Sequence, residues 1–206
     1  MEINTEQNME QLILEVAENL FLEKGFAMTT TTEIARVAGC NQALVHYYYR
    51  TKERLFDKIF EKKAKMFFTS FMQTNEENIP FEEKLKKSIE AHFNILIENP
   101  KFPFLLFNEL TTNPKRLNSI KQTLGSIPLE IIGKIQNEFQ NEIKKGNIRP
   151  MNMVDFILTI ASLNVFLFVA KPIISGIFGM SEEDYIEFLE LRKQENIRII
   201  LNSLKP

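Results

Sequence analysis

Apolar side chains recur every three or four residues along most of the chain, which is the period of an α-helix. In the first stretch they form an unbroken amphipathic pattern made of Met9, Leu12, Ile13, Val16, Ala17, Leu20 and Phe21. Gly25 follows and predicts the end of this helix, because glycine tolerates the backbone conformation of a helix C-cap. The pattern as a whole predicts an all-α protein.

The next stretch, residues 30–52, predicts two short helices separated by a tight turn. Thr30 and Glu33 have the spacing of a capping box, in which a hydroxyl and a carboxylate satisfy the free amides of a helix start. Gly39 can end that helix sharply, and Asn41 is a good N-cap for a second one over residues 42–48. This is the helix-turn-helix arrangement, whose second helix enters the major groove of DNA.

The two faces of the second short helix differ in character. Val45 and Tyr49 are spaced to face inward. The predicted outward face carries Gln42, Ala43, Leu44, His46, Tyr47 and Tyr48. Three ring side chains in a row suit contact with phosphates and bases, although a helical hairpin within an all-α core is the alternative reading of this short motif.

Further helices follow to the end of the chain, which gives about nine in all. Thr51 is expected to cap a long helix over about 52–74, and the polar residues 75–80 form a boundary. Helices are then predicted over 81–98, 103–112 (closed near Pro114), 117–145 (interrupted near Gly125 and Pro128), 151–170 (ended by Lys171-Pro172) and 182–204, the last capped by Ser181. The helix over 151–170 is apolar on nearly every side, which indicates burial in the core or between subunits.

Composition narrows the class of protein. The chain has 206 residues, of which 44% are hydrophobic, enough for one or two domains with a buried core. Cys40 is the only cysteine, which excludes an internal disulfide and agrees with the cytoplasm. The N-terminus lacks the features of a signal peptide, and the longest uncharged apolar run, 156–170, is shorter than the ~20 residues that span a bilayer. No membrane association is expected.

The charge distribution is uneven. The net charge is −2, yet residues 36–65 contain eight lysines and arginines against three acidic residues. A local basic surface attracts phosphate even on a slightly acidic protein. The acidic counterweight lies mostly in the first helix, which need not face DNA.

Motifs of enzymes and metal proteins are missing from the sequence. It has two histidines and one cysteine, and it contains no C-x-x-C, H-E-x-x-H, G-x-S-x-G or P-loop motif. We therefore expect no enzyme activity, no cofactor and no metal.

Residues from about Val16 to Phe60 resemble the DNA-binding domain of the TetR family of bacterial transcriptional repressors. The matching residues are Ala17, Leu20, Phe21, Glu23, Lys24, Gly25, Phe26, Thr29 to Thr32, Ile34, Ala35, Ala38, Gly39, Tyr47, Tyr49, Lys52, Glu53 and Leu55. His46 stands where the family usually has Tyr, and Asn41 where Ser is common. Both replacements can form hydrogen bonds, so the resemblance implies DNA binding with an operator preference that can differ.

The resemblance implies a DNA-binding domain over 1–52 and a ligand-binding and dimerisation domain over 53–206, linked by the helix from about 52 to 74. Gln42 is the best candidate base reader, since its amide can bond adenine N6 and N7 together. Ala43 and Leu44 are expected on thymine methyl groups. The expected phosphate contacts are His46, Tyr47, Tyr48, Thr31, Thr32 and Lys52, with Lys52 at a helix N-terminus.

For the second domain the resemblance implies a mostly apolar pocket for a small effector. Candidate residues are Phe67, Phe71, His92, Phe104, Phe107, Asn108 and Asn164, each of which suits plain core packing as well. Asn164 needs a polar partner, either across a dimer interface or on the effector. The helices over 152–170 and 182–204 are expected to form the homodimer interface. The expected partners are an operator DNA duplex, a second copy and the effector; the alternative is a helical adaptor for a protein partner.

Overall fold

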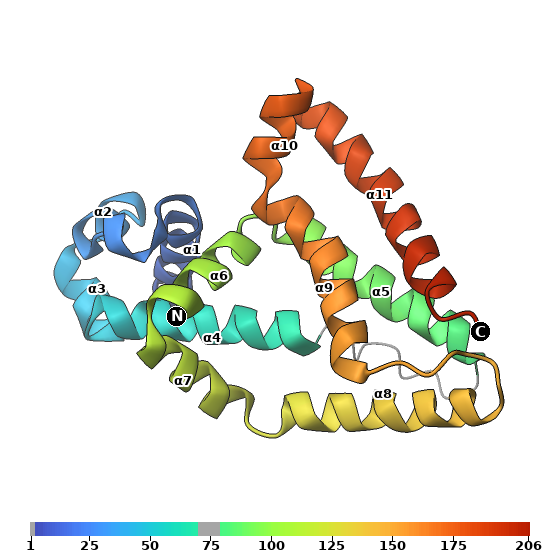
Figure 1. Cartoon of the computed structure of the whole chain (residues 1–206). Coiled ribbons are helices and arrows are strands. Elements are labelled where there is room, and N and C mark those ends of the chain that lie inside the picture. The colour runs from blue at the N-terminus through green and yellow to red at the C-terminus, as the bar shows by residue number, and fades with distance from the viewer. Residues whose placement is uncertain (1–2, 70–78) are drawn as a thin grey trace. The chain divides into compact units, whose positions relative to one another are not determined.

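A computed structural model describes residues 3–69 and 79–206 and confirms the all-α class. Eleven helices lie in this part of the chain (Figure 1): α1 (Ile3–Met28), α2 (Thr31–Val37), α3 (Gln42–Tyr49), α4 (Lys52–Thr69), α5 (Phe81–Glu98), α6 (Phe102–Thr112), α7 (Pro114–Leu124), α8 (Ile127–Lys144), α9 (Met153–Val169), α10 (Lys171–Phe178) and α11 (Glu182–Asn202). They form two compact units. Unit 1 is Met1–Lys65 with Leu105–Ile120, and unit 2 is Met66–Phe104 with Lys121–Pro206.

Aromatic packing between α1 and α4 forms the core of unit 1. Phe21 meets Phe56 edge to face at a ring separation of 4.8 Å, and Phe56 stacks on Phe60 at 5.3 Å. All three rings are fully buried, which confirms the inward side predicted for Phe21 by the amphipathic pattern of α1. Gly25 breaks α1 with φ 75° and ψ 174°, which confirms the predicted interruption and lets Phe26 close against Phe56 at 5.0 Å.

The late segment 105–120 belongs to unit 1 although it is distant in sequence from the helix-turn-helix. It carries Arg116, whose guanidinium lies 4.2 Å from the centre of the Phe56 ring and pairs with Asp57. This compact unit therefore includes residues beyond 52, because Arg116 of α7 packs on Phe56 of α4.

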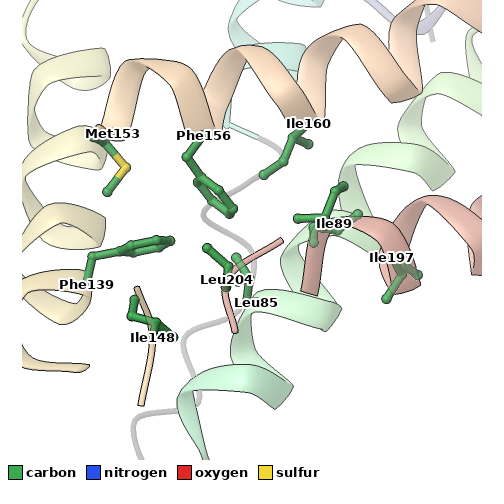
Figure 2. Packing of buried hydrophobic residues seen from close by; sticks show 10 residues of the cluster. Leu85, Ile89, Phe139, Ile148, Met153, Phe156, Ile160, Ile197 and Leu204 are labelled. Atoms are coloured by element: carbon green, nitrogen blue, oxygen red, sulfur yellow. The ribbon is translucent and has the colours of Figure 1, made fainter. Parts of the chain in front are cut away.

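Unit 2 is built on α5, α9 and α11, which pack against one another. Its main apolar cluster, drawn in Figure 2, comes from these helices, from α8 and from the segments that follow α8 and α11. Its members are Leu85, Ile89, Phe139, Ile148, Met153, Phe156, Ile160, Ile197, Ile200 and Leu204. The rings of Phe139 of α8 and Phe156 of α9 face each other, with their centres 4.7 Å apart (Figure 2). Ser181 begins α11 with a full capping box to Asp184, which confirms the predicted start.

The helix ends predicted before the two prolines are confirmed, since α6 ends at Thr112 and α9 at Val169, but each proline also begins a new helix. Pro114 is the first residue of α7, three residues before the predicted start at 117, because proline is favourable in the first turn of a helix. Pro172 lies in the first turn of α10, a helix that the sequence analysis missed; the chain bends by 65° between α9 and α10. Within the described residues, no single helix is long and apolar enough to cross a bilayer, and only this bent pair reaches the required length and composition.

The surface of α9 is apolar on one side. Val154, Leu158 and Phe166 are 58–62% exposed, whereas Phe156, Ile160 and Phe168 are buried. The single chain therefore buries one face of the uniformly apolar helix and leaves the other uncovered.

Candidate nucleic-acid interface

The turn between α2 and α3 has the predicted geometry. Gly39 takes φ 70°, and the Asn41 side chain accepts a hydrogen bond from the Leu44 amide at 2.9 Å, as an N-cap should. The Thr30 hydroxyl accepts from the Glu33 amide at 3.1 Å, but the Glu33 carboxylate pairs with Lys24 instead of completing the predicted capping box. Cys40 is half-buried, and this burial raises the pKa of its thiol.

Both faces of α3 are oriented as predicted. Val45 and Tyr49 are buried, and the Tyr49 hydroxyl donates to the Glu10 carbonyl of α1 at 3.1 Å. Gln42, Ala43, His46 and Tyr47 are exposed, and Leu44 and Tyr48 are half-buried. Tyr47, 67% exposed, meets the Tyr48 ring edge to face at 5.2 Å. The helix is therefore held from behind and offers polar and aromatic side chains to a partner.

The exposed end of α3 carries a hydrogen-bonded group that links it to α2. Gln42 Nε2 lies 2.9 Å from Thr31 Oγ1 and 3.3 Å from His46 Nε2. His46 Nδ1 lies 3.0 Å from the carbonyl oxygen of Arg50. Thr31, Gln42 and His46, each predicted separately as a DNA contact, thus form one cluster; Thr32 beside them is exposed.

Arg50, directly after α3, has an unusual backbone conformation that the sequence did not reveal. Its φ of 64° and ψ of −54° belong to a γ-turn, closed by a hydrogen bond of 2.7 Å from the Thr51 amide to the Tyr49 carbonyl. A non-glycine residue is strained here, and such strain is concentrated at functional sites. The turn brings the Arg50 carbonyl onto the imidazole of His46.

Lys52 occupies a different environment from the one expected of a phosphate-binding residue. Its Nζ donates to the carbonyls of Phe26 and Thr29, both at 3.0 Å, and lies 4.2 Å from the centre of the Phe26 ring. These carbonyls lie at the end of α1, where helical partners run out. In this structure Lys52 holds α4 to the segment between α1 and α2, and two of its three hydrogens serve that purpose.

The predicted basic surface is partly neutralised. Lys58 pairs with Glu10 at 3.2 Å and Lys63 with Glu18 at 2.7 Å, so acidic residues of α1 face two lysines of α4. Arg36, Arg50 and Arg54 are exposed on or beside the short helices. Positive charge at the site therefore comes mainly from arginines next to α3.

Arg116 anchors α7 to α4 beneath this site. It is 7% exposed, lies within 5.2 Å of the Phe26 ring centre, and pairs with Glu109 through Nε at 2.9 Å in addition to Asp57. Burial raises the pKa of Asp57, an effect that the neighbouring guanidinium opposes. No local pattern in the sequence points to this cluster, because Arg116 and Asp57 are 59 positions apart.

Three of the predicted effector residues meet in unit 2. The rings of Phe67 and His92 are 5.2 Å apart, and His92 Nδ1 lies 3.1 Å from Asn164 Nδ2. Asn164 Oδ1 accepts from Asn196 Nδ2 at 3.0 Å, and Asn196 Oδ1 accepts from Arg192 at 2.7 Å. The partners of Asn164 are therefore residues of its own chain. Burial lowers the pKa of His92 to about 3, so its imidazole is neutral.

The remaining effector candidates are arranged differently. Phe104 and Phe107 are 61% and 53% exposed, and Asn108 is exposed as well, because these residues lie on the outer side of α6, whose inner side carries Leu105 and Leu106. Phe71 lies outside the described residues. A pocket of about 200 Å³ does occur in unit 2, and its lining contains none of the predicted residues: Gln136, Phe139, Gln140, Met151, Asn152 and Met153. The described residues contain no cluster of potential metal ligands.

Comparison with known proteins agrees with this geometry. Residues 13–59 match the family of bacterial regulatory proteins called tetR. The chain is 30% identical to the HTH-type transcriptional regulator QacR of Staphylococcus aureus (strain Mu50 / ATCC 700699) over 96% of this chain and 98% of that protein. It is 26% identical to the biofilm operon icaADBC HTH-type negative transcriptional regulator IcaR of Staphylococcus epidermidis, over 58% of this chain and 63% of that protein.

A solved structure of a tetR-family regulatory protein from Rhodococcus RHA1 shares the fold, with a TM-score of 0.71 at 18% identity over 96% of this chain and 97% of that one. The fold and the exposed face of α3 define a helix-turn-helix regulator of transcription. The chain belongs to the TetR family, whose members are DNA-binding regulators and not enzymes. This membership favours DNA as the partner of α3 over the protein-binding adaptor.

Proposed function

We propose that this TetR-family regulator is a homodimeric repressor that binds a palindromic operator through α3 and leaves it when a small, mostly apolar effector binds unit 2. The observation that carries the proposal is the exposed row Gln42, Ala43, His46 and Tyr47 on a helix anchored by buried Val45 and Tyr49. Such a helix inserts its free side into the major groove, and the neighbouring arginines attract phosphates. The relative IcaR is a negative transcriptional regulator, which supports repression.

Uncovered apolar surface supports the homodimer. Large exposed apolar side chains gather on the last three helices of unit 2: Val154, Leu158, Phe166, Ile173, Ile177, Phe178, Ile186, Leu191 and Ile199. Large exposed apolar surface is typical of an interface, and a second copy of the chain brings an identical set of apolar side chains. A dimer places two copies of α3 on one side of a duplex, about one helical turn (~34 Å) apart.

The aromatic environment around Phe67 and His92 supports effector binding in unit 2. The polar groups there are few and already hydrogen-bonded to each other, which suits a site that is mostly apolar with a few orienting groups. An effector releases DNA only to the extent that it binds the released conformation more tightly than the DNA-bound one.

The test is a binding titration of the purified protein on the DNA upstream of its own gene and on a scrambled duplex, over a series of salt concentrations. We expect sequence-specific binding, two protomers per site and an affinity that falls steeply with salt, because phosphate contacts release counterions. A matched pair of variants separates dimerisation from folding. Leu158→Asp should give a monomer with weak operator binding, whereas Leu129→Asp, on α8 and even more exposed (73% against 59%), should remain dimeric. Equal binding of all duplexes at every salt concentration would contradict the proposal.

A further inference from the structure

The hydrogen-bonded cluster Thr31–Gln42–His46 determines which polar atom of Gln42 is free to meet a base. This inference rests on the proposed contact of α3 with the major groove. It begins at Arg50, whose carbonyl oxygen lies 3.0 Å from His46 Nδ1. A carbonyl oxygen only accepts hydrogen bonds, so Nδ1 must carry the proton. In the neutral imidazole, Nε2 is then the atom with the free lone pair.

The acceptor at His46 Nε2 orients the Gln42 amide. The Gln42 atom that lies 3.3 Å from His46 Nε2 has to donate a hydrogen bond to it. This atom is therefore the amide nitrogen Nε2 and not the amide oxygen. The second hydrogen of the same nitrogen points to Thr31 Oγ1 at 2.9 Å. Both donors of the amide are thereby used within the protein, while Gln42 Oε1 has no recorded hydrogen-bond partner among residues 3–69 and 79–206.

We propose that His46 and Thr31 are specificity-determining residues that hold Gln42 with its carbonyl oxygen outward, so that Gln42 selects a base with an exocyclic amino group. In the major groove these groups are adenine N6 and cytosine N4, whereas guanine and thymine present acceptors at the corresponding positions. Gln42 then forms a single hydrogen bond to the base, and either adenine or cytosine can provide its donor. This differs from the two-bond pairing with adenine expected from the sequence, which needs a free donor on the same amide.

The strained γ-turn at Arg50 has a definite role in this arrangement. Its φ of 64° aims the carbonyl back at His46, which fixes the tautomer and so the direction of the whole chain of hydrogen bonds. The family's usual Tyr at position 46 has a hydroxyl that both donates and accepts, and it would not fix the amide in the same way. His46, one of the two residues that depart from the family pattern, is therefore the one that sets this preference.

The experiment is a selection of bound sequences from a randomised duplex library with the purified full-length protein, in parallel with Gln42→Ala, His46→Lys and the double variant. Lysine only donates, so it turns the amide oxygen inward and leaves the Gln42 NH₂ facing the base. The wild type should prefer adenine or cytosine over guanine or thymine by about tenfold at one position of each half-site. His46→Lys should reverse that preference at the same position, and Gln42→Ala should abolish it alone and in the double variant.

The outcomes separate the two levels of the proposal. If the wild type enriches no sequence, the DNA-binding proposal fails and this inference with it. If a half-site motif is recovered but His46→Lys leaves every position unchanged, or the wild type prefers guanine or thymine where Gln42 acts, DNA binding stands and the orientation of Gln42 by His46 is wrong. His46→Lys and the double variant should retain the wild-type melting temperature, because position 46 is exposed. A changed base preference then reports base readout and not unfolding.

Discussion

Acidification should destabilise unit 2 through His92, and the structure gives the size of the effect. The imidazole is 1% exposed and accepts from Asn164 Nδ2 in its neutral form. Burial lowers its pKa from 6.5 to about 3 in the folded protein. Below pH 6.5 the unfolded chain therefore binds a proton that the folded chain does not, and the free energy of unfolding falls as the pH falls.

The magnitude follows from the linkage relation. Each pH unit between 6.5 and 3 removes about 1.4 kcal/mol, whereas the full contribution is present above pH 6.5. His92→Asn keeps an acceptor near the position of Nδ1 but cannot titrate. It loses the ring packed at 5.2 Å from Phe67, which should cost about 2 kcal/mol near pH 7. The stabilities of the two proteins should therefore converge near pH ~5.

The assay is urea unfolding at fixed protein concentration from pH ~7 to ~4.5, with hydrogen exchange of the α5, α9 and α11 amides as a readout confined to unit 2. Carboxylates titrate in the same range, so the quantity to compare is the difference between wild type and variant. His46→Asn is the matched control, because it removes the other histidine and leaves His92 in place. Parallel pH profiles for wild type and His92→Asn would refute the reasoning, since they would mean that His92 binds protons equally in both states.

Two further predictions concern the anchors of unit 1. Arg116→Met should destabilise unit 1 by about 3 kcal/mol, because it leaves the buried Glu109 carboxylate without its partner; thermal unfolding measures this, with the exposed Arg198→Met as the control expected to change nothing measurable. Lys52→Met should lower the free energy of unfolding in the absence of DNA by about 1–2 kcal/mol, since the Lys52 ammonium donates to the backbone carbonyls of Phe26 and Thr29. An unchanged melting temperature together with a reduced salt dependence of DNA binding would instead assign Lys52 to phosphate alone.

Local patterns in the sequence determined the helix-turn-helix almost completely. The caps at Asn41, Thr51 and Ser181, and the breaks at Gly25 and Gly39, depend on hydrogen bonds and backbone angles within a few residues. The helical period alone identified the buried and exposed sides of α3. The new helices that have Pro114 and Pro172 in their first turns were missed or started too late, because proline is compatible both with the end of one helix and with the first turn of the next.

The tertiary structure decided which polar groups meet. The hydrogen bond between His92 and Asn164 joins residues 72 positions apart, and Arg116 reaches Asp57 over 59 positions, distances at which no local pattern constrains the pairing. It likewise decided that Phe104 and Phe107 are exposed, since helical spacing gives a face but not what covers it. Within the DNA-binding face, the sequence supplied Gln42 as the reader. Only the approach of Thr31, His46 and the Arg50 carbonyl fixed its orientation, because an amide has two ends and its neighbours in space choose between them.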